Sequence, residues 1–197
     1  MANFLERHRI GYKIVRESLK ILLITSIINT MGGASIEAIQ ERLFALLPFL
    51  ILLTPLNDFV GNLGTILASK FTTYLYLGKI TDQHWYHNPS MRELMLKLMI
   101  IAIFCGLYLS IGAFVIAAIK GFEHGLLFSI FFLLRLVMGT LFTALLLLLI
   151  LIFVTATFGW YVYKKNQDPD NFLVPLTTSI ADIGTMVLFA ATIHFLF

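Results

Sequence analysis

The fold class of this chain is decided by its final stretch, FLVPLTTSIADIGTMVLFAATIHFLF, residues 172–197. The stretch is apolar and long enough to cross a bilayer, which takes about 20 residues in a helix. Asp182 lies near its middle, where an ionised carboxylate facing lipid costs roughly 2.5–3.5 kcal/mol. Counted from Phe172 at 1.5 Å per residue, Asp182 lies about 15 Å into the helix, near the bilayer midplane. This position raises the question of what the carboxylate faces.

The whole chain has the composition of an integral membrane protein. Of its 197 residues, 59% are hydrophobic and 13% are charged, whereas soluble domains carry about 25% charged residues. The apolar runs lack the alternation of β-barrel strands, and helices are the remaining structure that satisfies the backbone in lipid. The single Cys105 excludes disulfides and cysteine-rich metal sites within one chain. The net charge of +3 is a signal of membrane topology, and no nucleic-acid partner is expected.

We expect an all-α integral membrane protein with five transmembrane helices. The predicted helices cover residues 18–36, 43–69, 94–119, 126–162 and 172–197. The first is the weakest, because NTMGGASIEA (29–38) adds small and polar residues to its second half. No stretch resembles a soluble domain or a linker, so residues 1–197 are predicted to form a single membrane domain.

Lysine and arginine predict the orientation of these helices. Eleven of them lie on one side, in the N-terminal segment and around the second and fourth connections, while Arg42 and Lys120 lie on the other. Basic residues are enriched on the cytoplasmic side of membrane proteins. The basic segment 1–17 and the N-terminus are therefore expected in the cytoplasm and the C-terminus outside it, in a multi-pass protein of the plasma membrane.

The second predicted helix carries another group of polar residues at membrane depth. In PLNDFVGNLGTILASK (55–70), Asn57, Asp58 and Asn62 lie within six residues of one another. Three oxygen-bearing side chains so close together favour a polar cavity or a pore wall. Gly61 and Gly64 belong to a stripe of small residues, which close helix packing explains equally well.

On the last predicted helix, Thr178, Asp182 and Thr185 share one face, and Ser179 lies beside it. Hydroxyl groups one turn on either side of the carboxylate can hydrate it or line its water. The alternative is a protonated aspartate that hydrogen-bonds to a neighbouring helix. Carboxylate, amide and hydroxyl oxygens are the ligands that hard cations such as Mg²⁺ prefer, whereas Zn²⁺ and Cu⁺ favour histidine and cysteine.

Two stretches resemble a known family. GNLGTILASKFTTYLYLGKI (61–80) and DPDNFLVPLTTSIADIGT (168–185) look like the membrane domain of MgtE-type magnesium channels. They are more similar still to the solute-carrier magnesium transporters, which carry two copies of this domain. The resemblance implies five helices per domain and a pore between two domains, so that a single-copy chain acts as a homodimer. It also implies that Asp182 recognises the cation in the pore, and that Gly61, Asn62 and Gly64 match the family's Gly-Asn-x-Gly motif.

One feature departs from the resemblance. Bacterial MgtE channels carry large cytoplasmic regulatory domains ahead of the membrane part, whereas only residues 1–17 precede the first predicted helix. Gating is therefore expected to be built into the helices or supplied by a partner.

The predicted function is transport of a divalent cation through the membrane, most simply Mg²⁺, which is held largely hydrated because it gives up its waters reluctantly. Mn²⁺ and Co²⁺ suit similar ligands and remain alternatives. The predicted metal-binding residues are Asp182, Thr178, Thr185, Asn62 and Asp58, and the predicted pore-lining residues are Gly61, Gly64, Asn57 and Ser179. The alternatives are a structural or assembly subunit and an intramembrane aspartyl protease. The protease is disfavoured because the Gly-x-Gly-Asp context of that family is missing, so the chain is not expected to be an enzyme.

Overall fold

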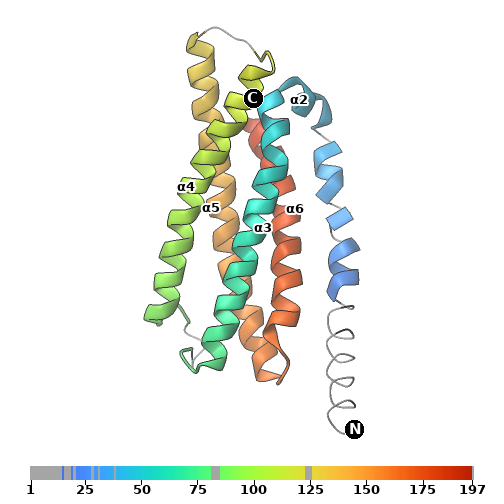
Figure 1. Cartoon of the computed structure of the whole chain (residues 1–197). Helices are drawn as coiled ribbons and strands as arrows, with labels where there is room; N and C mark the ends of the chain where they lie inside the picture. The colour runs from blue at the N-terminus through green and yellow to red at the C-terminus, as the bar shows by residue number, and fades with distance from the viewer. Residues whose placement is uncertain are drawn as a thin grey trace, which may run out of the picture.

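Long helices form most of the described structure (Figure 1). The computed structural model describes residues 15, 19, 21–27, 29–30, 32–37, 39–80, 85–122 and 126–196. Its elements are α2 (Gln40–Ala45), α3 (Leu47–Tyr76), η1 (Trp85–His87), α4 (Pro89–Ile119), α5 (Leu126–Lys164) and α6 (Pro169–Leu196). These residues contain no strand, which agrees with the predicted all-α class. The basic segment predicted for residues 1–17 lies, apart from Val15, outside the described residues.

Four of the described helices are long and apolar enough to cross a membrane. They are Leu47–Tyr76, Pro89–Ile119, Ser129–Lys164 and Pro169–Phe195. Large hydrophobic side chains such as Phe104 and Phe153 are exposed on their outer surfaces, as lipid contact requires. The first predicted helix corresponds to a shorter apolar helix, Ile21–Glu37, which is near the lower length limit for a span. The chain is thus a multi-pass membrane protein, and the count of five spans remains a prediction.

Several helices begin earlier or end later than their apolar runs. α3 ends at Tyr76 rather than at residue 69, and residues 43–45 belong to α2 rather than to the same span. α4 begins at Pro89 rather than at residue 94, because the Asn88 side chain accepts hydrogen bonds from the backbone N–H groups of Ser90 (2.9 Å) and Met91 (3.4 Å). These polar caps lie outside the apolar runs, so hydropathy alone misses the true helix ends.

α6 also begins before its apolar run. It starts at Pro169 rather than at residue 172, and Asp168 accepts a hydrogen bond from the backbone N–H of Asp170 at 3.2 Å. The cap is therefore Asp168, and a proline follows it at a position where the missing N–H costs little. With these bounds, Asp182 lies at the middle of the 28-residue helix.

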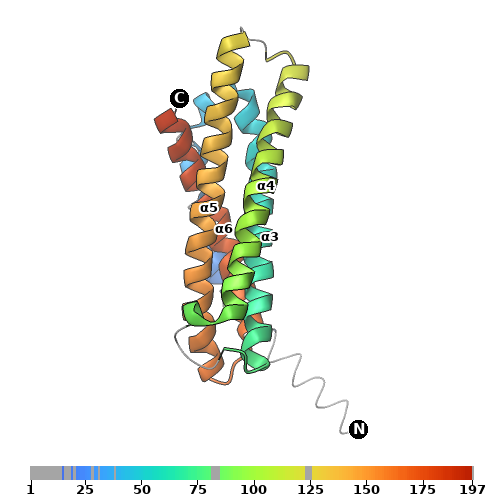
Figure 2. The same cartoon turned by 90° about the vertical axis from the view of Figure 1, so that its left-hand side faces the viewer.

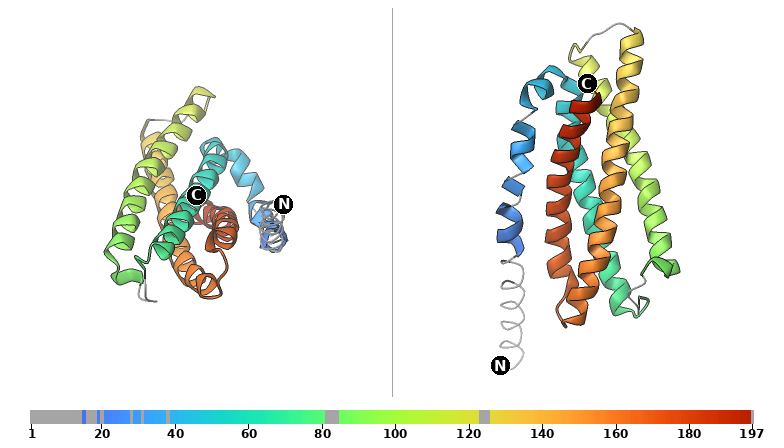
Figure 3. Two further views of the ribbon diagram at one scale, coloured as in Figure 1. Left: turned by 60° about the horizontal axis from the view of Figure 1, so that its bottom comes forward. Right: turned by 180° about the vertical axis from the view of Figure 1, so that it is seen from behind.

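α3 packs against α4, α5 and α6, and α5 likewise packs against α3, α4 and α6. α4 lies on the side of α3 and α5 that faces away from α6, and the segment Ile21–Glu37 runs beside α6 (Figure 3). At one end of the bundle, Phe49 of α3 packs against Phe132 of α5 and Phe189 of α6, with ring centroids 5.8 Å and 5.4 Å apart. α6 therefore lies between α3 and the segment Ile21–Glu37, which we call the first segment. This arrangement positions the site described below.

The connections α3–α4 and α5–α6 lie at the same end of the bundle (Figure 2). Tyr76 and Tyr163 make an edge-to-face contact there, with centroids 5.6 Å apart. Lys79 lies over the Tyr74 ring at 5.3 Å, and Lys164 lies over the Trp160 ring at 5.1 Å. Aromatic and basic residues gather in this way at a membrane–water interface. The fold thus brings together the two basic connections for which the sequence predicts a cytoplasmic location.

Candidate functional site

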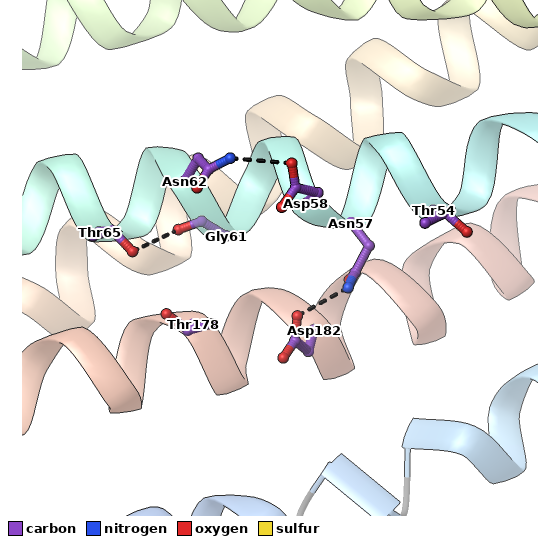
Figure 4. A pocket seen from close by; sticks show the side chains of 8 residues that line it. All are labelled: Thr54, Asn57, Asp58, Gly61, Asn62, Thr65, Thr178 and Asp182. Carbon is purple, nitrogen blue, oxygen red and sulfur yellow. Dashed lines mark hydrogen bonds between the residues drawn. The ribbon is translucent and has the colours of Figure 1, made fainter. Parts of the chain in front are cut away.

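A polar pocket of about 200 Å³ lies between the central parts of α3 and α6. Figure 4 shows its lining residues: Thr54, Asn57, Asp58, Gly61, Asn62, Thr65, Thr178 and Asp182. The α3 residues recur at intervals of three and four, so they share one helical face. Thr178 and Asp182 are one turn apart on α6. The pocket thus combines polar residues from the two stretches that the sequence analysis singled out.

Two asparagine amides hold the carboxylate of Asp182. Asn57 Nδ2 donates to Oδ1 at 2.9 Å, and Asn29 Nδ2 donates to Oδ2 at 3.2 Å. Asn57 belongs to α3 and Asn29 to the first segment, so three helical segments meet at this half-buried side chain. A carboxylate has about four acceptor positions on its two oxygens. Two of them therefore remain for other donors, such as water.

Asp58 and Asn62 lie on the exposed side of α3. They are one turn apart, and Asn62 Nδ2 donates to Asp58 Oδ2 at 3.2 Å. Figure 4 shows this pair beside the Asn57–Asp182 contact. A carboxylate at this depth is costly when it faces lipid. This face of α3 must therefore adjoin water or another protein chain.

Two of the three hydroxyl groups that line the pocket donate their protons within their own helices. Thr178 Oγ1 donates to the carbonyl oxygen of Val174 at 2.9 Å, and Thr65 Oγ1 donates to that of Gly61 at 3.1 Å. A hydroxyl that donates in this way keeps its oxygen lone pairs as acceptors. Carboxylate and hydroxyl oxygens consequently give the pocket the acceptor character that suits a cation and its waters.

Three residues expected at the site lie elsewhere. Thr185 is fully buried, Ser179 is 6% exposed, and neither lines the pocket. Gly64 is also absent from the lining, and a Cβ atom at this position would lie 3.2 Å from Thr177 Cβ and 3.4 Å from Leu151 Cδ1. Gly64 therefore allows α3, α5 and α6 to approach closely, as small residues do in membrane helix packing.

Sequence reasoning did not find three lining or contacting residues, which are Thr54, Thr65 and Asn29. Thr65 lies one turn beyond Gly61 on α3. Thr54 continues the face of Asp58 by one turn, so extension of the four-residue spacing would have found it. Asn29 opens the polar stretch that weakened the first predicted helix. A polar side chain inside a membrane segment is itself a signal of function or of helix contact.

The oxygen-bearing side chains that line the pocket suit a hard, hydrated cation. Within the described ranges, no group of three or more His, Cys, Asp or Glu side chains is close enough to hold a metal ion. The pocket instead offers the carboxylates of Asp58 and Asp182 with nearby amides and hydroxyls. Mg²⁺ is commonly held by one or two carboxylates while it keeps several waters.

Together, the fold and the pocket define a multi-pass helical membrane protein with an oxygen-lined site halfway along its helices, the features of a cation transport protein. Residues 53–192 match the family model MgtE, described as a divalent cation transporter. The chain belongs to the MgtE family of divalent cation transporters. The family description is one of ion transport rather than of catalysis, which agrees with the expectation that the chain is not an enzyme. The matched range includes every pocket-lining residue of α3 and α6.

Curated relatives agree with this assignment. The chain is similar to solute carrier family 41 member 2 of Macaca fascicularis, Gallus gallus and Homo sapiens, with 23%, 24% and 23% identity over 203 residues. In each case the alignment covers 96% of this chain and 34% of the relative. The chain thus spans about a third of the length of the curated relatives that it matches.

Proposed function

We propose that the chain is a subunit of a Mg²⁺ channel or transporter of the plasma membrane, with its N-terminus in the cytoplasm, and that the cation passes along the pocket face of α3 and α6. The observation that carries this proposal is the pocket itself. It contains the carboxylates of Asp58 and Asp182 at the depth where polar side chains cost most in lipid. Asp182 is the main cation-binding residue, and Asp58, Asn62 and Thr178 contact the waters of the ion.

The size of the pocket suits a hydrated ion. A volume of about 200 Å³ leaves room for several water molecules around an ion. Mg²⁺ prefers six oxygen ligands in octahedral geometry and dehydrates reluctantly. A carboxylate that contacts the ion through its water shell binds it and still releases it. Mn²⁺ and Co²⁺ suit the same oxygens and compete for the site.

A homodimer explains the exposed polar face of α3. Asp58 and Asn62 are exposed in the single chain, as are Thr54 and Thr73 on the same helix. A second copy of the chain, with its own α3 and α6 facing the first, would enclose these side chains around a water-filled path. The resemblance to a family in which two such domains form the pore supports the same arrangement.

The proposal is tested by measuring cation flux through the purified chain. The chain is reconstituted into liposomes that contain a Mg²⁺-sensitive dye, and external Mg²⁺ is added. We expect uptake well above that of protein-free liposomes. An imposed pH or Na⁺ gradient that leaves the rate unchanged indicates a channel, and one that drives accumulation indicates a coupled carrier. No uptake above the protein-free level contradicts transport and favours an assembly subunit.

The dimer is tested by cross-linking in membranes. In a Cys105→Ser background, Thr73→Cys places a thiol on the exposed polar face of α3, and Phe104→Cys places one on the lipid-facing surface of α4 as a control. We expect an oxidant to trap dimers through position 73 and not through position 104. Monomers alone at both positions contradict the arrangement.

A further inference from the structure

The first segment contacts α6 through one helical face. Its inward positions recur at intervals of four and three: Ile21, Thr25, Asn29 and Gly32. Ile21 and Thr25 are 8% and 4% exposed, whereas Leu22, Leu23, Ile24 and Ile27 are more than half exposed. A Cβ atom at Gly32 would lie 3.1 Å from Met186 Sδ and 3.4 Å from Ile183 Cα of α6. The face that contains Asn29 is thus in close contact with α6.

Asn29 supplies the polar contact across this face. The Thr25 hydroxyl donates to the carbonyl oxygen of Leu22 in its own helix at 3.1 Å. Asn29 instead donates across to Asp182 at 3.2 Å. Apolar burial provides little driving force between helices in lipid, so packing and hydrogen bonds between helices determine how they associate. The position of the first segment is therefore coupled to the carboxylate of Asp182.

We propose that Asn29 is a positioning residue for Asp182, and that the first segment thereby helps to set the cation affinity of the site. The inference rests on the proposed function of Asp182. The terminal torsion of an aspartate is soft, and a single donor leaves the carboxylate free to rotate. Asn29 and Asn57 each bind a different oxygen, which fixes the carboxylate plane and leaves the remaining acceptor positions for the waters of the ion. A preorganised ligand binds more tightly because less freedom is lost on binding.

The first test separates affinity from transport rate. Asn29→Leu replaces the amide with an apolar side chain of similar size, and Asn29→Ser keeps a polar group too short to make the same contact. We expect the Mg²⁺ concentration for half-maximal uptake to rise roughly two- to tenfold in both variants, because a carboxylate held by one donor loses more rotational freedom when it binds the ion, with the maximal rate little changed. The control is Thr30→Ala, since Thr30 is exposed and bonds to Ser26 in its own helix. The control should behave as the wild type.

The second test does not depend on transport. Infrared difference spectra of the Mg²⁺-free protein identify the carboxylate stretch of Asp182 as the band that is lost in Asp182→Ala. We expect Asn29→Leu and Asn29→Ser to shift this band, and Thr30→Ala to leave it in place. An unshifted band together with wild-type affinity in both Asn29 variants overturns the inference.

The two proposals fail in different ways. If Asp182→Ala abolishes uptake but the Asn29 variants behave as the wild type, Asp182 keeps its role and Asn29 is a packing residue only. If Asp182→Ala transports normally, the proposed function of Asp182 is wrong, and the inference about Asn29 falls with it.

Discussion

Two neighbouring glycines of α3 provide a matched test of the packing. A Cβ atom at Gly64 would lie 3.2 Å from Thr177 Cβ, whereas one at Gly61 would lie 3.9 Å from Thr178 Cγ2. Ordinary carbon contacts are about 3.5–4.0 Å, so Gly64→Ala overpacks the junction with α6 and Gly61→Ala does not. Overpacking costs typically ~1–3 kcal/mol. The change from glycine to alanine gains roughly 0.5–1 kcal/mol of helix propensity at either position.

The gain in helix propensity is common to both variants. The difference between their free energies of unfolding therefore measures the cost of the contact at Gly64. We expect the free energy of unfolding of Gly64→Ala to be about 1–3 kcal/mol lower than that of Gly61→Ala. The measurement is denaturation by sodium dodecyl sulfate in mixed micelles, followed by circular dichroism. Gly61→Ala should be at least as stable as the wild type and should lower the Mg²⁺ flux, because its methyl group enters the pocket lining. Equal stability of the two variants would refute the assignment of Gly64, but not Gly61, to close helix packing.

The other predictions concern the rim of the pocket and a helix cap. Asn62→Ala removes the amide that donates to Asp58. It should change the concentration dependence of Mg²⁺ uptake with little loss of stability. Uptake curves identical to those of the wild type would mean that this pair contacts lipid or protein rather than the ion. Asn88→Ala removes the cap of α4 and should lower the free energy of unfolding by about 1 kcal/mol without changing flux, as denaturation and liposome uptake of the same sample will show.

Hydropathy predicted the spans well because the apolar runs are long and continuous. The ends of α4 and α6 could not be predicted in this way, because Asn88 and Asp168 cap them from outside the apolar runs. The first segment is the harder case. Asn29 and the residues after it lower its hydropathy, yet that same asparagine contacts Asp182. The feature that weakened the prediction of a span is thus part of the candidate site.

For the site, helical spacing predicted which residues share a face but not which neighbour lies against that face. Asn57, Asp58, Asn62 and Asp182 do line one pocket. Thr185 has helical spacing similar to that of Thr178 around Asp182, yet it is fully buried and Thr178 lines the pocket. Likewise, Gly61 and Gly64 lie less than one turn apart on α3, yet Gly61 lies near Thr178 and Gly64 lies near Thr177 and Leu151. Such differences depend on the tilt and rotation of packed helices, which a single sequence does not specify.

Transport by variants of Asp182 is the most direct test of the account. Asp182→Asn keeps the size of the side chain and an oxygen acceptor but removes the charge, and Asp182→Ala removes both. Because Asn29 and Asn57 lose their acceptor in Asp182→Ala, helical content and oligomeric state are checked first for each variant. Mg²⁺ uptake into liposomes is then compared with the wild type. We predict that Asp182→Asn loses most of its affinity and that Asp182→Ala transports no Mg²⁺. Undiminished uptake by folded Asp182→Ala would contradict the account and show that the cation path lies elsewhere.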